Sequence, residues 1–255
     1  MSDFAAAARG FAEMDEAALS GPWSWRNAQM DARNALYWAL EEAQEAVLAA
    51  AAGPAPESRR ILARAERAFG DLRGLLVGIP GNLFDTAPRE GEWPVRETLR
   101  HMLWIERRYM LQTRYAVVRT DADPMRIADT ELPPLAQIDG SGDADAVVAR
   151  LAHARAESNR VLDDVPPAGM TRPTIWVHYT VDVRFRLHRF ALHVVEHTIQ
   201  CEKALADLGW RQTEGRRMLR HFTAALAELD GLGAGAQARA LEQTLIERYA
   251  QVRTP

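Results

Sequence analysis

The chain contains little cysteine: Cys201 is the single one among 255 residues. One cysteine excludes an internal disulfide framework and is typical of proteins kept in a reducing compartment. No apolar run approaches the roughly 20 residues that a membrane-spanning helix needs. The N-terminal stretch carries acidic residues among its alanines and has no basic region, so it does not resemble a secretory signal peptide. We therefore expect a cytoplasmic protein with no membrane partner.

The sequence also lacks an excess of positive charge. It has 31 Lys and Arg residues against 35 Asp and Glu residues, a formal net charge of −4 and an isoelectric point near 6.0. Proteins that bind nucleic acid use positive charge to neutralise phosphates. This balance predicts that nucleic acid is not a partner.

Strand-like alternation of useful length is missing as well, and we find no internal repeat. Helical periodicity dominates instead. The expected helices cover residues 25–52, 57–77, 94–119, 143–163, 183–208, 212–229 and 236–252. A long connection, residues 120–142, and an irregular aromatic segment, residues 169–180, separate some of them. Helices joined by mostly short breaks predict an all-α protein, an up-and-down four-helix bundle with additional N- and C-terminal helices.

Histidine spacing gives the clearest indication of chemistry. His193 and His197 are four residues apart in an expected helix, so both imidazoles face the same side. His101 lies on the inner side of another expected helix, about ninety residues upstream, and could reach the same cleft. Three neutral imidazoles are good ligands for zinc, nickel or iron(II), and they leave a coordination position open for water or substrate. The pattern predicts a metal site.

Simpler interpretations of the histidine pair are also possible. The two residues could be a surface pair, or they could be hydrogen-bonded inside the bundle without any metal. Cys201 continues the spacing of 193 and 197, but its place in the apolar stripe favours a small buried thiol over a metal ligand. Glu106 and Glu202 could orient the histidines or act as a base, although salt bridges explain them equally well. The role of His178 is left open.

Two segments of the chain resemble a known family. The stretch GEWPVRETLRHMLWIERRYM resembles the second-helix motif of the DinB/YfiT-like superfamily of metalloenzymes, and FALHVVEHTIQCEKALADLG resembles its last bundle helix. The run ARAERAFGDLRGLLVGIPGNLFDTAP is similar to the family's first helix. The resemblance covers about residues 57–210, and the segments at both ends lie outside it.

The resemblance implies a DinB-like four-helix bundle over residues 57–210, with helical extensions at 1–56 and 211–255. It implies a metal site formed by His101, His193 and His197. It also implies frequent dimerisation. The aromatic residues Tyr37 and Trp38 lie beyond the main stripe of their helix and need a partner surface, either in the bundle of their own chain or in a second subunit. A homodimer is therefore expected.

Characterised relatives of this family use low-molecular-weight thiols, in bacillithiol transferases and in the mycothiol-dependent maleylpyruvate isomerase. The resemblance therefore implies a thiol-dependent transferase that acts on a small-molecule substrate with a divalent metal ion (zinc, nickel or iron). Hydrolysis by metal-bound hydroxide is an alternative within metal chemistry. A non-catalytic bundle that binds a ligand or a partner helix, with an incidental metal, is the alternative from a different class.

Overall fold

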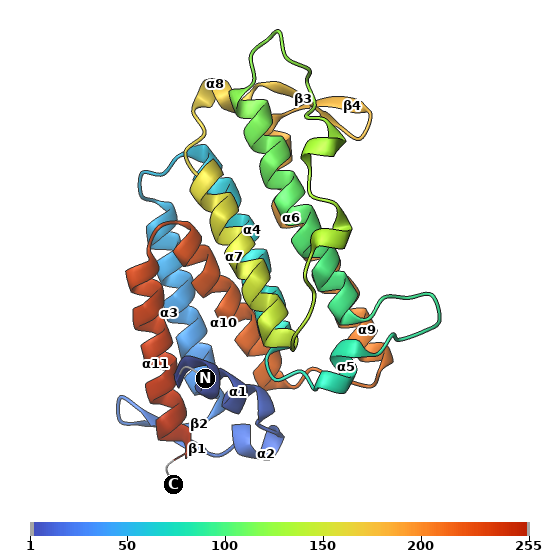
Figure 1. Ribbon diagram of the computed structural model, residues 1–255. Helices are drawn as coiled ribbons and strands as arrows, with labels where there is room; N and C mark the ends of the chain where they lie inside the picture. Colours follow the sequence, from blue (N-terminus) through green and yellow to red (C-terminus); the bar gives the residue numbers. More distant parts are fainter. Residues whose placement is uncertain (1–2, 254–255) are drawn as a thin grey trace. The chain divides into compact units, whose positions relative to one another are not determined.

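The computed structural model describes residues 3–253, and helices account for most of that range (Figure 1). The predicted all-α class is confirmed, with two short β-hairpins added. In chain order the elements are α1 (Asp3–Glu13), α2 (Glu16–Leu19), β1 (Pro22–Trp25), β2 (Ala28–Asp31), α3 (Arg33–Ala51), α4 (Glu57–Leu76), α5 (Gly81–Asp85), α6 (Val95–Val118), α7 (Ala144–Leu162), α8 (Pro167–Met170), β3 (Pro173–Trp176), β4 (Tyr179–Asp182), α9 (Val183–Asp207), α10 (Glu214–Gly231) and α11 (Gly235–Arg253).

The described chain divides into two compact units, which we treat separately. The central unit comprises residues 54–65 and 80–209, and the terminal unit comprises residues 3–53, 66–79 and 210–253. Helix α4 supplies residues to both units. The domain boundaries expected from the sequence, at residues 56 and 210, stay a prediction.

The core of the central unit draws on all four helices expected for the bundle. Leu62 of α4, Met110 of α6, Leu162 of α7 and Phe190 of α9 belong to one buried apolar cluster. Helix α6 packs against both α7 and α9. Because α6 and α9 are direct neighbours, side chains on their facing sides can meet.

The terminal unit has an apolar core of its own. Phe11 of α1, Leu36 of α3, Phe222 of α10 and Leu245 of α11 belong to its buried cluster. Within this unit α11 packs against α1 and α3, and α10 packs against α3. The sequence analysis anticipated α10 and α11 closely but not the N-terminal helices α1 and α2.

Aspartate side chains cap the beginnings of two bundle helices. The side chain of Asp143 accepts a hydrogen bond from the Ala146 amide at 2.9 Å, and α7 begins there. Asp182 accepts one from the Phe185 amide at 2.8 Å at the start of α9. Each carboxylate satisfies an amide that has no partner within its helix.

The helix predicted over residues 25–52 is wrong at its beginning. Residues 22–31 form the hairpin of β1 and β2, in which Trp25 pairs with Ala28, and α3 starts only at Arg33. The connecting residues Arg26 and Asn27 both have positive φ, as a type I′ turn requires. Four-residue strands are too short to show alternation, and the turn contains no glycine to mark it.

The segment expected to be irregular, residues 169–180, is also more regular than predicted. It contains the end of α8 and most of a second antiparallel hairpin, β3 with β4, in which Trp176 pairs with Tyr179. Val177 in this turn has a φ of 56°, a conformation that a β-branched residue rarely adopts. This hairpin leads directly into α9 and so sets where that helix begins.

None of the helices in residues 3–253 combines the length and the apolar character needed to cross a membrane.

Candidate metal centre

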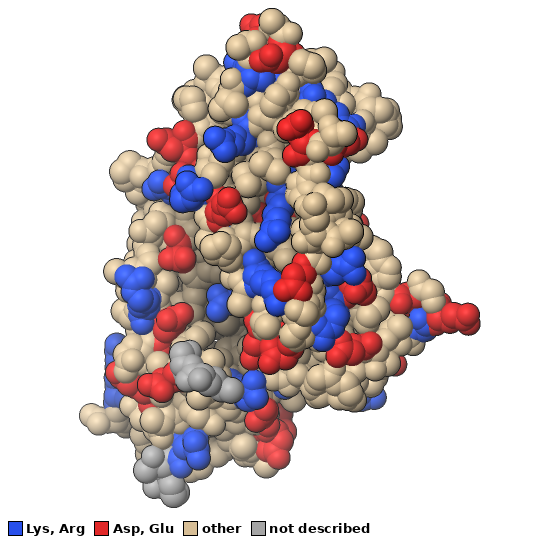
Figure 2. Space-filling model, viewed as in Figure 1, with Lys and Arg blue, Asp and Glu red and all other residues tan. Residues whose placement is uncertain are grey.

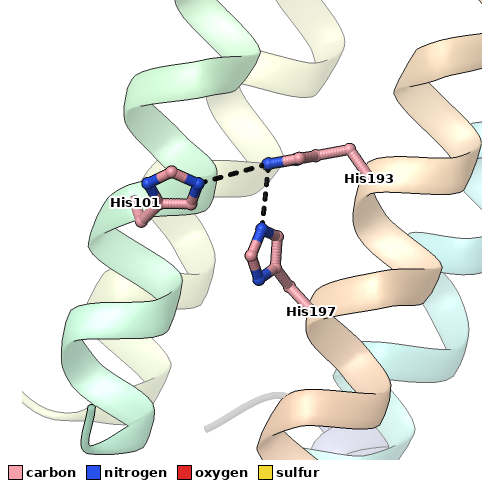
Figure 3. A group of neighbouring side chains, drawn as sticks. All are labelled: His101, His193 and His197. Carbon is pink, nitrogen blue, oxygen red and sulfur yellow. Dashed lines mark hydrogen bonds between the residues drawn. The ribbon is translucent and has the colours of Figure 1, made fainter. Parts of the chain in front are cut away.

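Three histidines from two helices of the central unit converge on one point (Figure 3). His101 projects from α6, and His193 and His197 project from α9. The Nε2 atoms of His101 and His193 are 3.4 Å apart, and those of His193 and His197 are 3.0 Å apart. One ring nitrogen of each residue lies within 4.8 Å of the other two.

The local fold explains why the two α9 imidazoles point the same way. A separation of four residues stacks their side chains on one face of the helix, as the sequence predicted. His193 and His197 are only 7% and 8% exposed, and they flank Val194, which packs inward. Burial on both sides of the pair restricts the side-chain rotamers and so fixes the direction of both rings.

The geometry fits a tetrahedral cation. With metal–nitrogen bonds of about 2.0–2.1 Å, neighbouring ligand atoms in a tetrahedral site lie roughly 3.3 Å apart. The two short nitrogen–nitrogen distances of this cluster lie close to that spacing. The donor set, three imidazoles and no carboxylate, suits zinc, nickel or iron(II) better than magnesium or calcium.

Gln200 orients one of the three rings. The Nδ1 atom of His197 lies 2.8 Å from the Oε1 atom of Gln200, one turn further along α9. If Nδ1 carries the proton and donates it to this oxygen, the lone pair of Nε2 faces the convergence point. The sequence analysis did not identify Gln200, because a spacing of three residues from His197 does not by itself show which way the imidazole ring turns.

The surroundings favour neutral imidazoles. Burial lowers the pKa of His193 to about 2, and the neighbouring His197 and His101 lower it further. Burial, followed by His197, also lowers the pKa of His101. A neutral imidazole keeps a lone pair free, which is the form that binds a metal.

Aromatic side chains surround the cluster. The ring centroids of Trp93 and Trp104 lie 5.3 Å and 5.8 Å from that of His101. Tyr109 packs edge-on to His193 at 5.5 Å, and burial raises its pKa. These rings cover part of the surfaces of His101 and His193.

A cavity of about 760 Å³ is lined by two residues that contact the cluster, although none of the three histidines lines it. It lies between the segment of residues 88–93 and the second half of α9, and it includes Trp93 and Gln200, which touch His101 and His197 respectively. Glu196 and Lys203 add charges of both signs to its wall. A cavity of this size accommodates a small molecule.

The long connection, residues 120–142, does not line this cavity. Its backbone is held against α6: the carbonyl of Pro133 accepts a hydrogen bond from the Trp104 indole at 2.8 Å, and that of Pro124 accepts one from the Tyr115 hydroxyl at 2.8 Å. Residues of the segment 88–93 line the cavity instead.

The other candidate residues lie away from the cluster. Glu106 accepts hydrogen bonds from Arg155 at 2.8 Å and from Ser158 on α7, so it serves the helix packing. His178 is exposed in the β3–β4 turn beside Tyr179. Glu202 is half-buried on α9 and is not part of the histidine cluster.

Cys201 is the buried thiol that the sequence predicted. It is fully inaccessible, and burial raises its pKa to about 12. A thiol with such a high pKa stays protonated near neutral pH and is a poor metal ligand or nucleophile.

Comparison with known protein families identifies the fold. The model of the DinB superfamily matches residues 64–201, which is more than half of the chain and includes all three histidines. The chain belongs to the DinB superfamily. A search of curated proteins gave no match. Membership and geometry together make the three-histidine cluster the candidate metal-binding site of this superfamily member.

Proposed function

We propose that this DinB superfamily protein is a divalent-metal-dependent enzyme that activates a low-molecular-weight thiol, or water, for transfer to a small electrophile. One observation carries the proposal: one ring nitrogen from each of three imidazoles lies within 4.8 Å of the other two, so that the three can hold one ion. Family membership supports a metal site at these positions. His101, His193 and His197 would hold the ion.

A bound cation supplies a lowered thiol pKa, so that a thiolate is available near neutral pH. Three protein ligands leave one coordination position for the nucleophile. In the transfer, the sulfur–carbon bond forms as the bond between carbon and the leaving group breaks, and the thiol proton must find an acceptor. We assign this role to Glu196, whose exposed carboxylate lines the cavity three residues from His193.

The remaining groups of the site bind and orient. Gln200 holds the ring of His197, and Trp93 presents an apolar surface that reaches from His101 into the cavity. Lys203 offers a positive charge to an anionic part of the thiol or the substrate. The side chains thus divide into ligands, an orienting amide, an apolar platform and charged contacts.

Turnover in matched variants tests the proposal. Zinc- or nickel-loaded protein is assayed with cysteine, glutathione or bacillithiol and a chromogenic aryl chloride, and thioether formation is followed. His101→Ala is expected to lose turnover while its circular dichroism spectrum is unchanged, and His178→Ala, an exposed histidine outside the site, keeps full turnover. Undiminished turnover after replacement of all three cluster histidines would overturn the proposal.

The alternative function, a non-catalytic binding module, makes the opposite prediction. Its ligand would bind in the cavity without the metal, so affinity would survive replacement of the three histidines. Absence of turnover with every thiol and with water, together with unchanged ligand binding in the triple variant, would favour the module.

We also propose a homodimer, formed through the exposed face of α9. The face consists of large apolar residues at heptad spacing: Phe185, Leu192, Val195 and Ile199. Leu192 and Ile199 are 52% and 53% exposed. Tyr37 and Trp38, which the sequence suggested for a dimer contact, make contacts within the terminal unit. The indole of Trp38 contacts Met30, and Tyr37 donates a hydrogen bond to Glu214 at 3.1 Å.

Light scattering tests this assembly. A dimer has twice the chain mass of 28.5 kDa, and Leu192→Glu should reduce the measured mass to that of a single chain. Leu48→Glu, on an exposed position of α3, is the control and should stay dimeric. A wild-type mass of 28.5 kDa at micromolar concentration would contradict the proposal.

For partners, we propose small molecules and not nucleic acid, and for location the cytoplasm, where small thiols are kept reduced. On the face drawn in Figure 2, Lys and Arg side chains are interspersed with Asp and Glu side chains. Such mixing offers no extended positive surface for a phosphate backbone.

A further inference from the structure

The two hairpins and the helices that follow them repeat each other at a constant distance along the chain. The pairs of β1 and β2 run from Pro22 with Asp31 to Trp25 with Ala28, and those of β3 and β4 run from Pro173 with Asp182 to Trp176 with Tyr179. Every position of the second hairpin equals the first plus 151. The four-residue helices α2 and α8, residues 16–19 and 167–170, precede the hairpins with the same offset.

The same offset aligns identical residues. They are the pairs Pro22 and Pro173, Trp25 and Trp176, Asp31 and Asp182, Arg33 and Arg184, Leu36 and Leu187, and Glu45 and Glu196. Too few positions agree to mark a repeat in the sequence, which is why the sequence analysis found none. The register and the offset of the structural elements reveal it.

Helices α3 and α9 also bury the same face at this offset. Leu36, Ala39 and Ala43 are buried in the terminal unit, and the corresponding residues of α9 are buried in the central unit: Leu187, Phe190 and Val194. Their neighbours match as well, since α11 packs on α1 and α3 just as α6 packs on α7 and α9. Helix α11 therefore corresponds to α6.

The offset maps two of the metal ligands onto the terminal unit. His193 corresponds to Glu42, and His197 corresponds to Ala46. In the central unit Tyr109 contacts both His193, at 5.5 Å, and Trp176, at 5.2 Å.

In the terminal unit Arg248 occupies the place of Tyr109. Its guanidinium lies 2.7 Å from Glu42 and 4.6 Å from the centroid of the Trp25 ring, the counterparts of His193 and Trp176. His101 precedes Tyr109 by eight residues, and eight residues before Arg248 stands Ala240.

A cavity of about 380 Å³ lies where these three positions meet. Glu42 and Ala46 of α3 and Ala240 of α11 all line it. Glu45, the counterpart of Glu196, lines it too. The positions that hold imidazoles in the central unit thus surround a cavity in the terminal unit.

We propose that the terminal unit contains a second copy of the metal site that has lost its ligands and retains the cavity. Alanine stands at two ligand positions, and the third, Glu42, is engaged by Arg248. The native chain therefore holds one divalent ion, in the central unit, and a second ion binds when histidines are restored at residues 42, 46 and 240. This inference rests on the proposed metal site, and its test separates the two.

The test installs the missing ligands. The variant combines Glu42→His, Ala46→His and Ala240→His with Arg248→Tyr, because Arg248 would otherwise lose its partner. Zinc per chain is measured by elemental analysis after reconstitution and dialysis. The expected result is a rise from one to two zinc ions per chain. In a chain whose natural three histidines are alanine, the expected rise is from zero to one.

The matched control carries Gln44→His and Leu48→His, at two exposed residues that do not line the cavity, in place of the changes at residues 42 and 46. It has the same number of histidines at the same spacing, turned by about 160° around α3. No additional zinc should bind to it. If the restored variant binds no more zinc than wild type, or if the control binds as much, the inference is overturned.

A crystal structure of the variant with histidines at residues 42, 46 and 240 tests the geometry of the second site without any bound metal. The three new imidazoles should bring their nitrogens as close together as those of the natural cluster, within 4.8 Å. Wild-type protein that takes up no zinc would refute the proposed function, whereas rings that point apart in this variant would refute the second site. If the fourfold variant does not fold, Ala46→His with Ala240→His alone places two rings for the same comparison.

Discussion

Helices α3 and α9 have the same structural setting but carry different residues at the positions of the candidate metal ligands. Each follows a hairpin of identical register, and each buries the same face against the helices of its unit. Yet α9 presents His193 and His197 where α3 presents Glu42 and Ala46. The hairpin and the buried helix face therefore determine where two side chains meet a neighbouring helix. The identity of the residues at those two positions determines whether a metal can bind there.

The largest effect on metal binding and turnover is expected when a histidine of α9 is replaced by the residue at the matching position of α3. His197→Ala copies Ala46, and it removes one of three metal ligands. We expect stoichiometric metal to be lost and turnover to fall at least about a hundredfold, because replacing a residue that only orients a metal ligand already costs about 10–100-fold. Elemental analysis and the thiol-transfer assay measure both. Retention of one tightly held ion by this variant would show that His197 is not a ligand.

Buried ion pairs allow the second comparison. Arg155 and Glu106 in the central unit are 1% and 4% exposed, while Arg248 and Glu42 in the terminal unit are 2% and 34% exposed. Glu106→Ala should lower the free energy of unfolding by about 3–5 kcal/mol, because it leaves a buried guanidinium without its main partner. Glu42→Ala should cost clearly less, since water can reach that site. Urea denaturation of both variants measures the difference, and an equal loss would contradict the account.

Gln200 and its counterpart Ala49 allow a third comparison. Gln200→Ala should weaken metal affinity about 10–100-fold without changing stoichiometry at saturating metal, because the ring of His197 loses its orienting contact. Ala49→Gln should leave the metal affinity unchanged, since no histidine stands beside it. Competition with a fluorescent zinc chelator measures both affinities. An unchanged metal affinity in Gln200→Ala would show that Gln200 does not orient His197 for metal binding.

The two helix starts differ in their caps. Asp182 accepts a hydrogen bond from the Phe185 amide, whereas the matching Asp31 contacts the side chains of Asn34 and Arg33. Asp182→Ala should destabilise the protein by about 1 kcal/mol, the usual cost of a lost N-cap. Asp31→Ala should cost less. Thermal unfolding of both variants tests this prediction. A larger loss of stability for Asp31→Ala than for Asp182→Ala would show that Asp31 stabilises its helix more than the Asp182 cap does.

The smallest effect is expected at Cys201. With its pKa raised to about 12, this thiol is protonated at pH 7 and at pH 9 alike. Only the thiolate reacts, so iodoacetamide should leave the native protein unmodified at both values and modify it after denaturation. Mass spectrometry reads the outcome. Rapid alkylation of the folded protein at pH 7 would show an accessible thiolate.

The sequence predicted the bundle and the convergence of the three histidines because both depend on short-range patterns, and metal binding by these histidines stays a prediction. Helical periodicity located α4, α6, α7 and α9, and the spacing of four residues placed His193 and His197 on one face. That His101 would meet them followed from its inner position on α6. The family match over residues 64–201 agrees with these elements.

Other features depend on contacts that short patterns do not carry. Each hairpin has strands of four residues and a turn without glycine, so neither periodicity nor turn chemistry marked it. The duplication is hidden because Ala39 and Ala43 fill positions where the other copy has Phe190 and Val194. The role of Gln200 required knowing how His197 turns its ring.

The central claim is that one divalent ion binds to three imidazoles of the central unit. X-ray absorption at the zinc edge of reconstituted wild-type protein tests it most directly, combined with elemental analysis of the same sample. We expect one zinc ion per chain with three imidazole ligands, and a loss of this signal when His101, His193 and His197 are all replaced by alanine. Wild-type protein without stoichiometric zinc, or zinc with the same ligands in the triple variant, would contradict it.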